Sequence, residues 1–417
     1  MTISLLPPLP APPTAPHRVA QLGLPWPTLR TLVLRHLFVA DGIAPPRLAA
    51  ALAVTPSVVG ELITRLTGDA AVDCGGLWLT EEGRLAGRES FRRSRYVGPL
   101  PVTAAAWTEQ AERQRLAARR IDLAAALQPL AVPPATIDRL GPAVVDARSL
   151  LLYGRDGNGK RAIGRAIAAE LVRHAGPIWV PTAVLAGDRL VTVFDASQHH
   201  PVTRHCGPVP PDPRFRCVRR PVVTLCPDAP SADPAATAAA PTLALAAGGV
   251  GLLDADAIHP ADRDRLLAAS DRERIDIGGT PLPATPTVIL HSADVLAATT
   301  SLRRVRHKVP VRSPDRVAFA RLLDTACRER SVAIDPQAAG VLWDTVVQRT
   351  AGWTGSRVVG TEAGSAKSSR RPRVTLRASD AADLVEIAVS ICRFREQPAV
   401  IRPAVLLDAA RQFLPAA

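Results

Sequence analysis

The sequence predicts an α/β core with a parallel sheet, preceded by a small helical module with a wing and followed by a helical C-terminal part. Three observations support this fold class. A glycine-rich stretch, Gly154–Lys160, lies between a short apolar run and a helical pattern. Further apolar runs, one ending at Asp254 and one covering 285–294, alternate with helical segments, as in parallel sheets with helices on both faces. Residues 313–417 carry mainly helical patterns.

Composition limits the class of protein. The chain has 417 residues, 47% of them hydrophobic, and a net charge of +13. This length allows two or three domains. The charge permits an acidic partner such as nucleic acid or nucleotide phosphate, although scattered surface arginine is the simpler explanation. No CxxC pair, signal peptide or membrane-length apolar run occurs, so we expect a cytoplasmic protein without a membrane partner.

The N-terminal part divides into a tail and a compact module. Residues 1–24 are rich in proline, and we expect a disordered tail. Within 25–95, helical patterns that open on proline or threonine come first. Residues 71–80 then resemble two short strands around a glycine pair, and a last helix follows. This order is typical of a winged helix-turn-helix.

Two roles are open for this module. Its third helix offers Ser57, Glu61, Thr64 and Arg65, only one of which is a cation, and the wing has no cation. A helix that reads DNA needs side chains that reach bases and phosphates, so docking to a protein partner is the favoured role. Nucleic-acid binding is the alternative, because several arginines follow between 84 and 95.

The remaining segments connect and complete the core. Residues 96–139 form a linker and a helical segment, and the α/β core covers 140–312, with a proline-rich insertion at 201–241. Histidines and cysteines gather between His199 and Cys226, but they lack the paired spacing of zinc ligands, so we expect a loop covering the core. The helical lid, 313–417, contains a Gly/Ser/basic stretch at 351–373 that we expect to be a flexible loop.

The glycine-rich stretch is the candidate nucleotide site. GRDGNGK matches the GxxxxGK pattern of phosphate-binding loops, and with 27 glycines and three lysines in 417 residues roughly 0.01 such matches are expected by chance. Backbone N–H groups and the N-terminus of the following helix hold phosphate in such loops. The candidate ATP-binding residues are Gly154, Asp156, Gly157, Asn158, Gly159, Lys160, Arg161 and Ala162.

Asp254 is the candidate metal-binding and catalytic carboxylate. It ends an apolar run, GVGLLD, that reads as a buried parallel strand. A carboxylate at the end of such a strand is what a magnesium–nucleotide site needs opposite its phosphate loop.

These motifs resemble those of a bacterial AAA+ ATPase family, described as predicted ATPases with chaperone activity, whose members carry an N-terminal winged helix. The similarity spans roughly residues 22–413 and includes "SRYVGPLPV", "LLLYGRDGNGK", "VTVFDASQH", "DPRFRCVRRPVV" and "SLRRVRHKVPV". It implies an AAA+ core with a helical lid that binds ATP between the subunits of a ring. It also implies that Arg303 or Arg304 reaches the γ-phosphate of a neighbouring subunit, with a solvated basic face as the alternative.

The sequence departs from this family at the positions that perform hydrolysis. Arg161 stands where Thr or Ser ligates Mg²⁺, Ala255 where a second acidic residue lies, and Ala293 where a polar residue meets the attacking water. The arginine of the lid is replaced by Ser379 or Ala382, with Arg377 as the nearest substitute. A guanidinium cannot ligate Mg²⁺, and alanine cannot deprotonate water.

We therefore expect a protein that binds ATP, hydrolyses it slowly or not at all, and does not use Mg²⁺ in the usual way. It would serve in a homo- or hetero-oligomer of AAA+ subunits as a remodelling or regulatory subunit. Two alternatives are a DNA-binding regulator that uses the core as an assembly platform, and an active ATPase in which Asp256 and Arg377 compensate.

Overall fold

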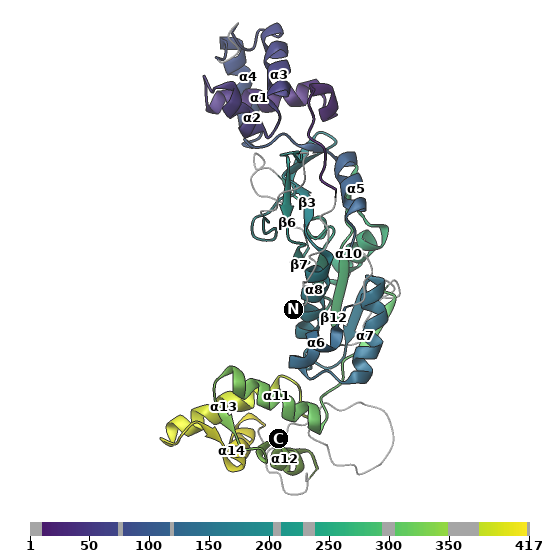
Figure 1. Cartoon of the computed structure of the whole chain (residues 1–417), viewed down its shortest axis with the longest axis vertical. Helices are drawn as coiled ribbons and strands as arrows, with labels where there is room; N and C mark the ends of the chain where they lie inside the picture. Colours follow the sequence, from purple (N-terminus) through teal and green to yellow (C-terminus); the bar gives the residue numbers. More distant parts are fainter. Residues whose placement is uncertain are drawn as a thin grey trace, which may run out of the picture.

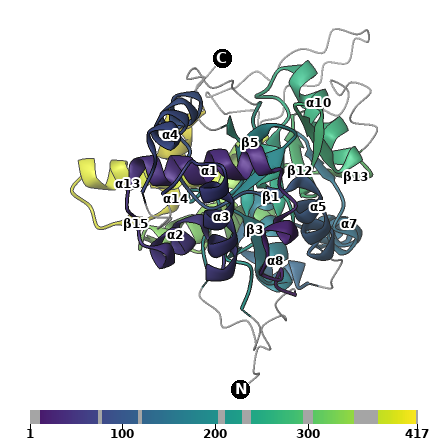
Figure 2. The same ribbon diagram turned by 90° about the horizontal axis from the view of Figure 1, so that it is seen from above.

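The computed structural model describes residues 11–73, 78–116, 121–202, 210–227, 238–293, 305–348 and 375–414. The molecule is elongated, with the N-terminal helices at one end, the α/β core in the middle and the C-terminal helices at the other end (Figure 1). Viewed along its long axis, the N-terminal helices lie over the core and the C-terminal helices project to one side (Figure 2).

The N-terminal module has its helices in the predicted order. They are α1 (Trp26–Val39), α2 (Pro45–Leu52), α3 (Pro56–Gly68) and α4 (Glu81–Arg93). Between α3 and α4, where the sequence predicts a wing, the described residues form one antiparallel bridge, Val72 to Leu79. Among the described residues, no single helix has both the length and the apolar composition to cross a membrane; α2 and α3 reach it only as a pair bent by 107°.

The expected disordered tail is wrong for residues 11–24. Val19 and Leu22, in the short helix η1 (Val19–Leu22), are 3% and 2% exposed and pack against the leucines of α1 and α3. Further upstream, Thr14 forms an antiparallel bridge with Pro211, and the N–H of Asp212 donates to the carbonyl of Pro13 at 2.8 Å. Apolar residues between the prolines supply the buried area that composition alone does not reveal.

The same N-terminal segment covers the start of α3. The hydroxyl of Thr55 donates to the carbonyl of Pro16 at 3.1 Å, and that of Ser57 donates to the carbonyl of His17 at 2.9 Å. The carboxylate of Glu61 accepts from the N–H of Val19 at 2.9 Å. The N-terminal end of a recognition helix is the part that contacts base edges, and here it is occupied by the chain itself.

A parallel sheet forms the centre of the core, as predicted. Its strand order is β13-β2-β12-β9-β7, and every neighbouring pair is parallel. The strands are β2 (Leu150–Tyr153), β7 (Val222–Thr224), β9 (Val250–Asp254), β12 (Thr287–Ser292) and β13 (His307–Pro310). Strand β12 therefore lies between the strand that leads into the phosphate loop and the strand that ends in Asp254.

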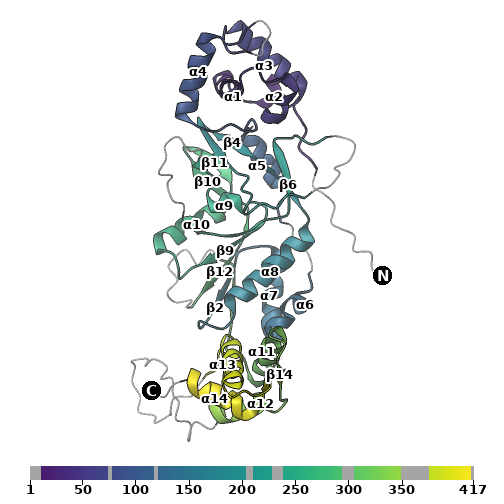
Figure 3. The same ribbon diagram turned by 90° about the vertical axis from the view of Figure 1, so that its left-hand side faces the viewer.

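Both faces of this sheet are covered, which explains why its strands are apolar without alternation. Leu150 and Leu152 pack on one side with α6 (Leu123–Leu127), α7 (Pro134–Asp146) and α8 (Lys160–Ala175). Leu151 faces a second cluster that includes residues of α5 (Ala104–Arg113) and α10 (Pro260–Arg272). Figure 3 shows α7 and α8 on one side of the sheet.

Part of the expected insertion at 201–241 belongs to the fold. Strand β7 from this segment is the edge of the central sheet, and β6 (Phe215–Val218) pairs antiparallel with β3 (Ile178–Pro181). Short strands interrupted by prolines concealed this contribution in the sequence.

The remaining strands of the core form two small sheets. One contains β1 (Val102–Thr103), β4 (Ala183–Ala186), β5 (Arg189–Thr192) and β8 (Ala238–Ala239), and the other contains β10 (Arg274–Ile277) and β11 (Thr280–Pro283). A short helix, α9 (Thr242–Leu245), precedes β9.

The C-terminal domain is helical, as predicted. It contains α11 (Arg316–Glu329), α12 (Ala338–Trp343), a π-helical turn (Asp344–Gln348), α13 (Asp380–Phe394) and α14 (Pro403–Phe413), with a short parallel pair, β14 (Ala333–Ile334) and β15 (Val400–Ile401). The cap of α11 is Asp315, whose carboxylate accepts from the N–H of Ala318 at 2.8 Å. The flexible loop expected at 351–373 lies outside the described residues.

The burial of the N-terminal segment makes a prediction about stability. We expect Leu22→Ala to lower the free energy of unfolding by about 2–4 kcal/mol, because truncation of a buried leucine leaves a cavity. Leu85→Ala is the matched control: Leu85 is 62% exposed, so its change should stay within about 0.5 kcal/mol. Chemical denaturation measures both variants, and equally small effects would show that the segment does not pack.

Candidate nucleotide site

The phosphate loop connects β2 to α8, as the sequence predicts. Its first N–H, from Gly154, donates to the carbonyl of Ser292 at 3.2 Å, and its last residue, Lys160, opens α8. Gly154 has a φ of 138°, and a Cβ atom there would lie 2.4 Å from the carbonyl oxygen of Val311. Both the backbone conformation and this close approach require glycine at the position.

Lys160 is held inside the loop. Its side chain is 8% exposed. The ammonium donates to the carbonyls of Gly154 and Arg155 at 2.5 and 3.2 Å, and to the carboxylate of Asp156 at 3.0 Å. This contact holds the pKa of Asp156 below its usual range.

Asn158 joins the loop to the start of the C-terminal domain. The side chain is buried, and its amide donates to the hydroxyl of Ser313 at 3.2 Å and, more weakly, to the carbonyl of Val311 at 3.5 Å. Ser313 lies two residues before Asp315, the N-cap of α11. The loop therefore has a fixed position relative to the segment that leads into the lid.

The guanidinium of Arg161 forms an ion pair with the carboxylate of Asp254, which joins the first turn of α8 to the end of β9. Arg161 contacts the Oδ2 atom, and the N–H of Asp256 donates to Oδ1 at 3.2 Å. Both oxygens of the predicted metal ligand are thus engaged. The side chain of Arg161 is 69% exposed and that of Asp254 is 21% exposed.

These residues do not fit a magnesium ion. Mg²⁺ requires oxygen ligands in octahedral geometry, and its usual ligands here would be a hydroxyl at position 161 and the carboxylate of Asp254. Position 161 supplies a cation, and the carboxylate accepts hydrogen bonds from that cation and from the backbone.

His291 belongs to the site although the sequence analysis did not select it. It lies in β12 opposite Asp254, and its Nδ1 atom is 3.9 Å from Oδ1 of that residue. Within the described part of the chain, this buried Nδ1 has no hydrogen-bond partner. Burial lowers the pKa of His291, Asp254 opposes this effect and Arg161 adds to it. A polar residue within the apolar run TVILHS was the available signal.

Asp256 is not placed as a general base. Its carboxylate accepts from the hydroxyl of Ser292 at 2.7 Å and from the N–H of Ala293 at 2.6 Å. These bonds tie the end of β9 to the end of β12. Ala255, at the expected position of the base, is 1% exposed and has no group that can accept a proton.

The C-terminal domain touches the loop directly. The N–H of Ser379 donates to the carbonyl of Gly157 at 2.8 Å. A Cβ atom at Gly157 would lie 2.7 Å from the hydroxyl of Ser379 and 2.9 Å from Cδ of Arg377. Arg377 also helps to lower the pKa of Asp156. Of the lid residues considered from the sequence, Arg377 therefore supplies a cation at the loop, and Ser379 supplies a backbone contact.

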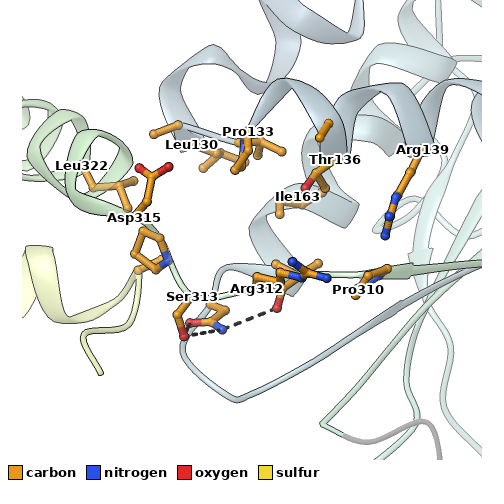
Figure 4. A pocket seen from close by; sticks show the side chains of 17 residues that line it. Leu130, Pro133, Thr136, Arg139, Ile163, Pro310, Arg312, Ser313, Asp315 and Leu322 are labelled. Carbon is orange, nitrogen blue, oxygen red and sulfur yellow. Dashed lines mark hydrogen bonds between the residues drawn. The ribbon is translucent and has the colours of Figure 1, made fainter. Parts of the chain in front are cut away.

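Two adjoining cavities surround the loop. One, of about 800 Å³, is lined by the loop residues 156–162, by Asp254 and His291, and by Ser379. Every predicted ATP-binding residue except Gly154 lines it. The other, of about 350 Å³, has apolar walls from Leu130, Pro133, Ile163 and Leu322 (Figure 4).

The two cavities share lining residues, including Asn158 and Ile163. Ligand pockets of this kind typically measure about 300–1,000 Å³ and combine apolar walls with a few polar groups. The pair thus offers one compartment at the phosphate loop and a second beside it, in which apolar side chains lie together with Arg139, Arg312 and Asp315.

Two other groups were singled out in the sequence analysis. Arg303 and Arg304 lie outside the described residues. His199 is buried, accepts from the N–H of Asp195 and pairs with the carbonyl of Leu245, so it has a structural role. In the described ranges, no group of three or more His, Cys, Asp or Glu is placed to hold a metal ion.

Comparison with known proteins gives a weak structural similarity. No family model and no curated protein sequence matches the chain. Two single-substitution variants of Thermotoga maritima RuvB each have 14% identity over 67% of this chain and 70% of theirs, with TM-scores of 0.39 and 0.40. RuvB titled Holliday junction branch migration motor, from the same organism, has 14% identity over 70% of each chain, with a TM-score of 0.38. Similarity of this size does not define an activity, so function must be inferred from the contacts around Lys160 and Asp254.

The surroundings of His291 make a prediction about pH. Because its pKa lies below the usual 6.5, its contribution to stability is complete above about pH 6.5 and is lost as the pH falls through the lowered value. Arg161→Thr removes the repelling cation and leaves Asp254 in place, so the pKa of His291 should rise. NMR titration of the imidazole protons measures this shift. An unchanged or lower pKa in the variant would contradict the placement of Arg161 beside this histidine.

Proposed function

We propose that the chain is an AAA+ protein that binds ATP between its core and its helical C-terminal domain and hydrolyses it slowly or not at all. The observation that carries this proposal is the ion pair between Arg161 and Asp254, within a phosphate loop that is otherwise intact. This ion pair separates ATP binding from ATP hydrolysis. It leaves the phosphate-binding backbone in place and engages the carboxylate that hydrolysis needs.

Support for binding comes from the loop and its cavities. Backbone N–H groups at the N-terminus of α8 and the ammonium of Lys160 favour phosphate. The adjoining cavity combines apolar walls from Leu130, Ile163 and Leu322 with polar groups, a combination suited to the base of the nucleotide. Ser379 and Arg377 close the site from the C-terminal domain.

Support for impaired turnover comes from the groups that should steer water and metal. Ala255 stands at the expected position of the general base. The carboxylate of Asp256 accepts hydrogen bonds from the end of β12, and Arg161 forms an ion pair with the expected metal ligand, Asp254. The loss of one such positioned group reduces a rate by about 10²–10³, and several losses together leave little activity. An active ATPase in which Asp256 compensates is the less favoured alternative, because that carboxylate is already engaged.

We assign the chain a remodelling or regulatory role within an assembly of AAA+ subunits, with the N-terminal module docking to a protein. The contacts of Pro16, His17 and Val19 with the start of α3 favour protein docking over DNA binding. A regulator that binds DNA would need this segment to leave α3 first. Arg303 and Arg304 remain candidates for contacts with the nucleotide of a neighbouring subunit.

The first test concerns binding. Isothermal titration with ATP should show binding to the full chain that Lys160→Ala weakens by about tenfold to a hundredfold, because the variant loses the cation at the loop. Lys308→Ala is the matched control, since Lys308 lies on β13 and contacts only the carbonyl of Val305 among the described residues. No heat of binding with the unmodified protein, or equal loss in both variants, would refute the assignment.

The second test concerns turnover. Phosphate release from ATP by the wild-type chain should be near background, and the double substitution Arg161→Thr, Ala255→Glu should increase it, because it restores a metal-ligating hydroxyl and a base. If the unorthodox residues were themselves catalytic, the same double substitution would lower an activity that is already measurable. Brisk wild-type turnover would exclude the degenerate site.

A further inference from the structure

The residues that replace the metal site permit one inference that deepens, and depends on, the proposed ATP binding. We propose that Arg161 is a built-in counter-ion, so that this site takes a nucleoside triphosphate free of metal and Mg²⁺ weakens its binding. In the usual arrangement a separate divalent ion neutralises the phosphates. Here the chain places a permanent cation at that position.

The first support is the position of the guanidinium. Arg161 follows Lys160 in the first turn of α8, and both line the 800 Å³ cavity. From there Arg161 extends to Oδ2 of Asp254 at the end of β9. Its charge therefore lies between the phosphate loop and the carboxylate, which is the space that a magnesium ion would need.

The second support is that the ion pair is easily exchanged. An ion pair in which the arginine side chain is 69% exposed contributes little to the stability of the fold. The contact with Asp254 uses one nitrogen, Nη2, of the guanidinium. A guanidinium has five N–H donors and binds phosphate in a planar, two-pronged geometry. Donors therefore stay available for phosphate oxygens within the same cavity.

The third support is that the carboxylate oxygens at this position, among the described residues, already accept hydrogen bonds. Oδ1 of Asp254 accepts from the backbone, and the carboxylate of Asp256 accepts from Ser292 and Ala293. A divalent cation bound here would lie next to a guanidinium of like charge. A metal-free triphosphate keeps its full negative charge and gains most from the cations of Lys160 and Arg161.

The test compares ATP affinity in EDTA with that in excess Mg²⁺, using isothermal titration of the full chain. For wild type we expect binding about tenfold or more weaker in Mg²⁺, because only the metal-free nucleotide fits. For Arg161→Thr we expect the opposite result, namely tighter ATP binding in Mg²⁺ than in EDTA. Arg173→Thr is the matched control: Arg173 lies in the same helix, is 67% exposed and pairs with Glu170, and its loss should leave the wild-type order unchanged.

Electron paramagnetic resonance with Mn²⁺ gives a readout that does not depend on affinity differences. Wild type with ATP should hold no protein-bound Mn²⁺, whereas Arg161→Thr should hold it. Tighter wild-type binding in Mg²⁺ would overturn the counter-ion inference and leave the proposed function intact. No ATP binding in either buffer would overturn the proposed function itself. The comparison of wild-type ATP affinity in EDTA and in Mg²⁺ needs no variant, so it tests the inference even if Arg161→Thr misfolds.

Discussion

The register of three parallel strands determines the geometry of the site. In β12, Ser292 lies opposite Tyr153 of β2, and His291 lies opposite Asp254 of β9. Because the carboxyl ends of parallel strands meet at one edge of a sheet, this register brings the phosphate loop, the carboxylate and the imidazole together. A shift by one residue would turn each of these side chains to the other face. The ion pair of Arg161 with Asp254 depends on that alignment.

Much of the fold followed from local patterns. The parallel core strands β2, β9 and β12 and the helices of the C-terminal domain were predictable, because apolar runs and helical periodicity reflect burial directly. Strand β7 was not, because it is short, lies at the sheet edge and sits among prolines. The composition of residues 11–24 predicts disorder for a similar reason, because it records the prolines but not the contacts of Val19 and Leu22.

The loop residues were predictable because glycine and lysine spacing reflects a backbone requirement. The family resemblance also predicts which groups for hydrolysis are replaced. The sequence did not show the contact of Arg161 with Asp254, because that pair joins segments 93 residues apart. Nor did it indicate that Asp256 is bonded to Ser292 and Ala293. Such contacts depend on strand order, which single-sequence patterns do not specify.

The backbone bond from Ser379 to Gly157 connects the phosphate cradle to a domain that begins far along the chain. An anion that reshapes the cradle would alter this bond, and the bond joins the core in the middle of the molecule to the C-terminal domain at one end. In a site that releases its ligand without hydrolysis, any resulting movement of the C-terminal domain is reversible. It performs no net work over a cycle of binding and release. The position of the C-terminal helices would then depend on the nucleotide concentration and not on energy released by hydrolysis.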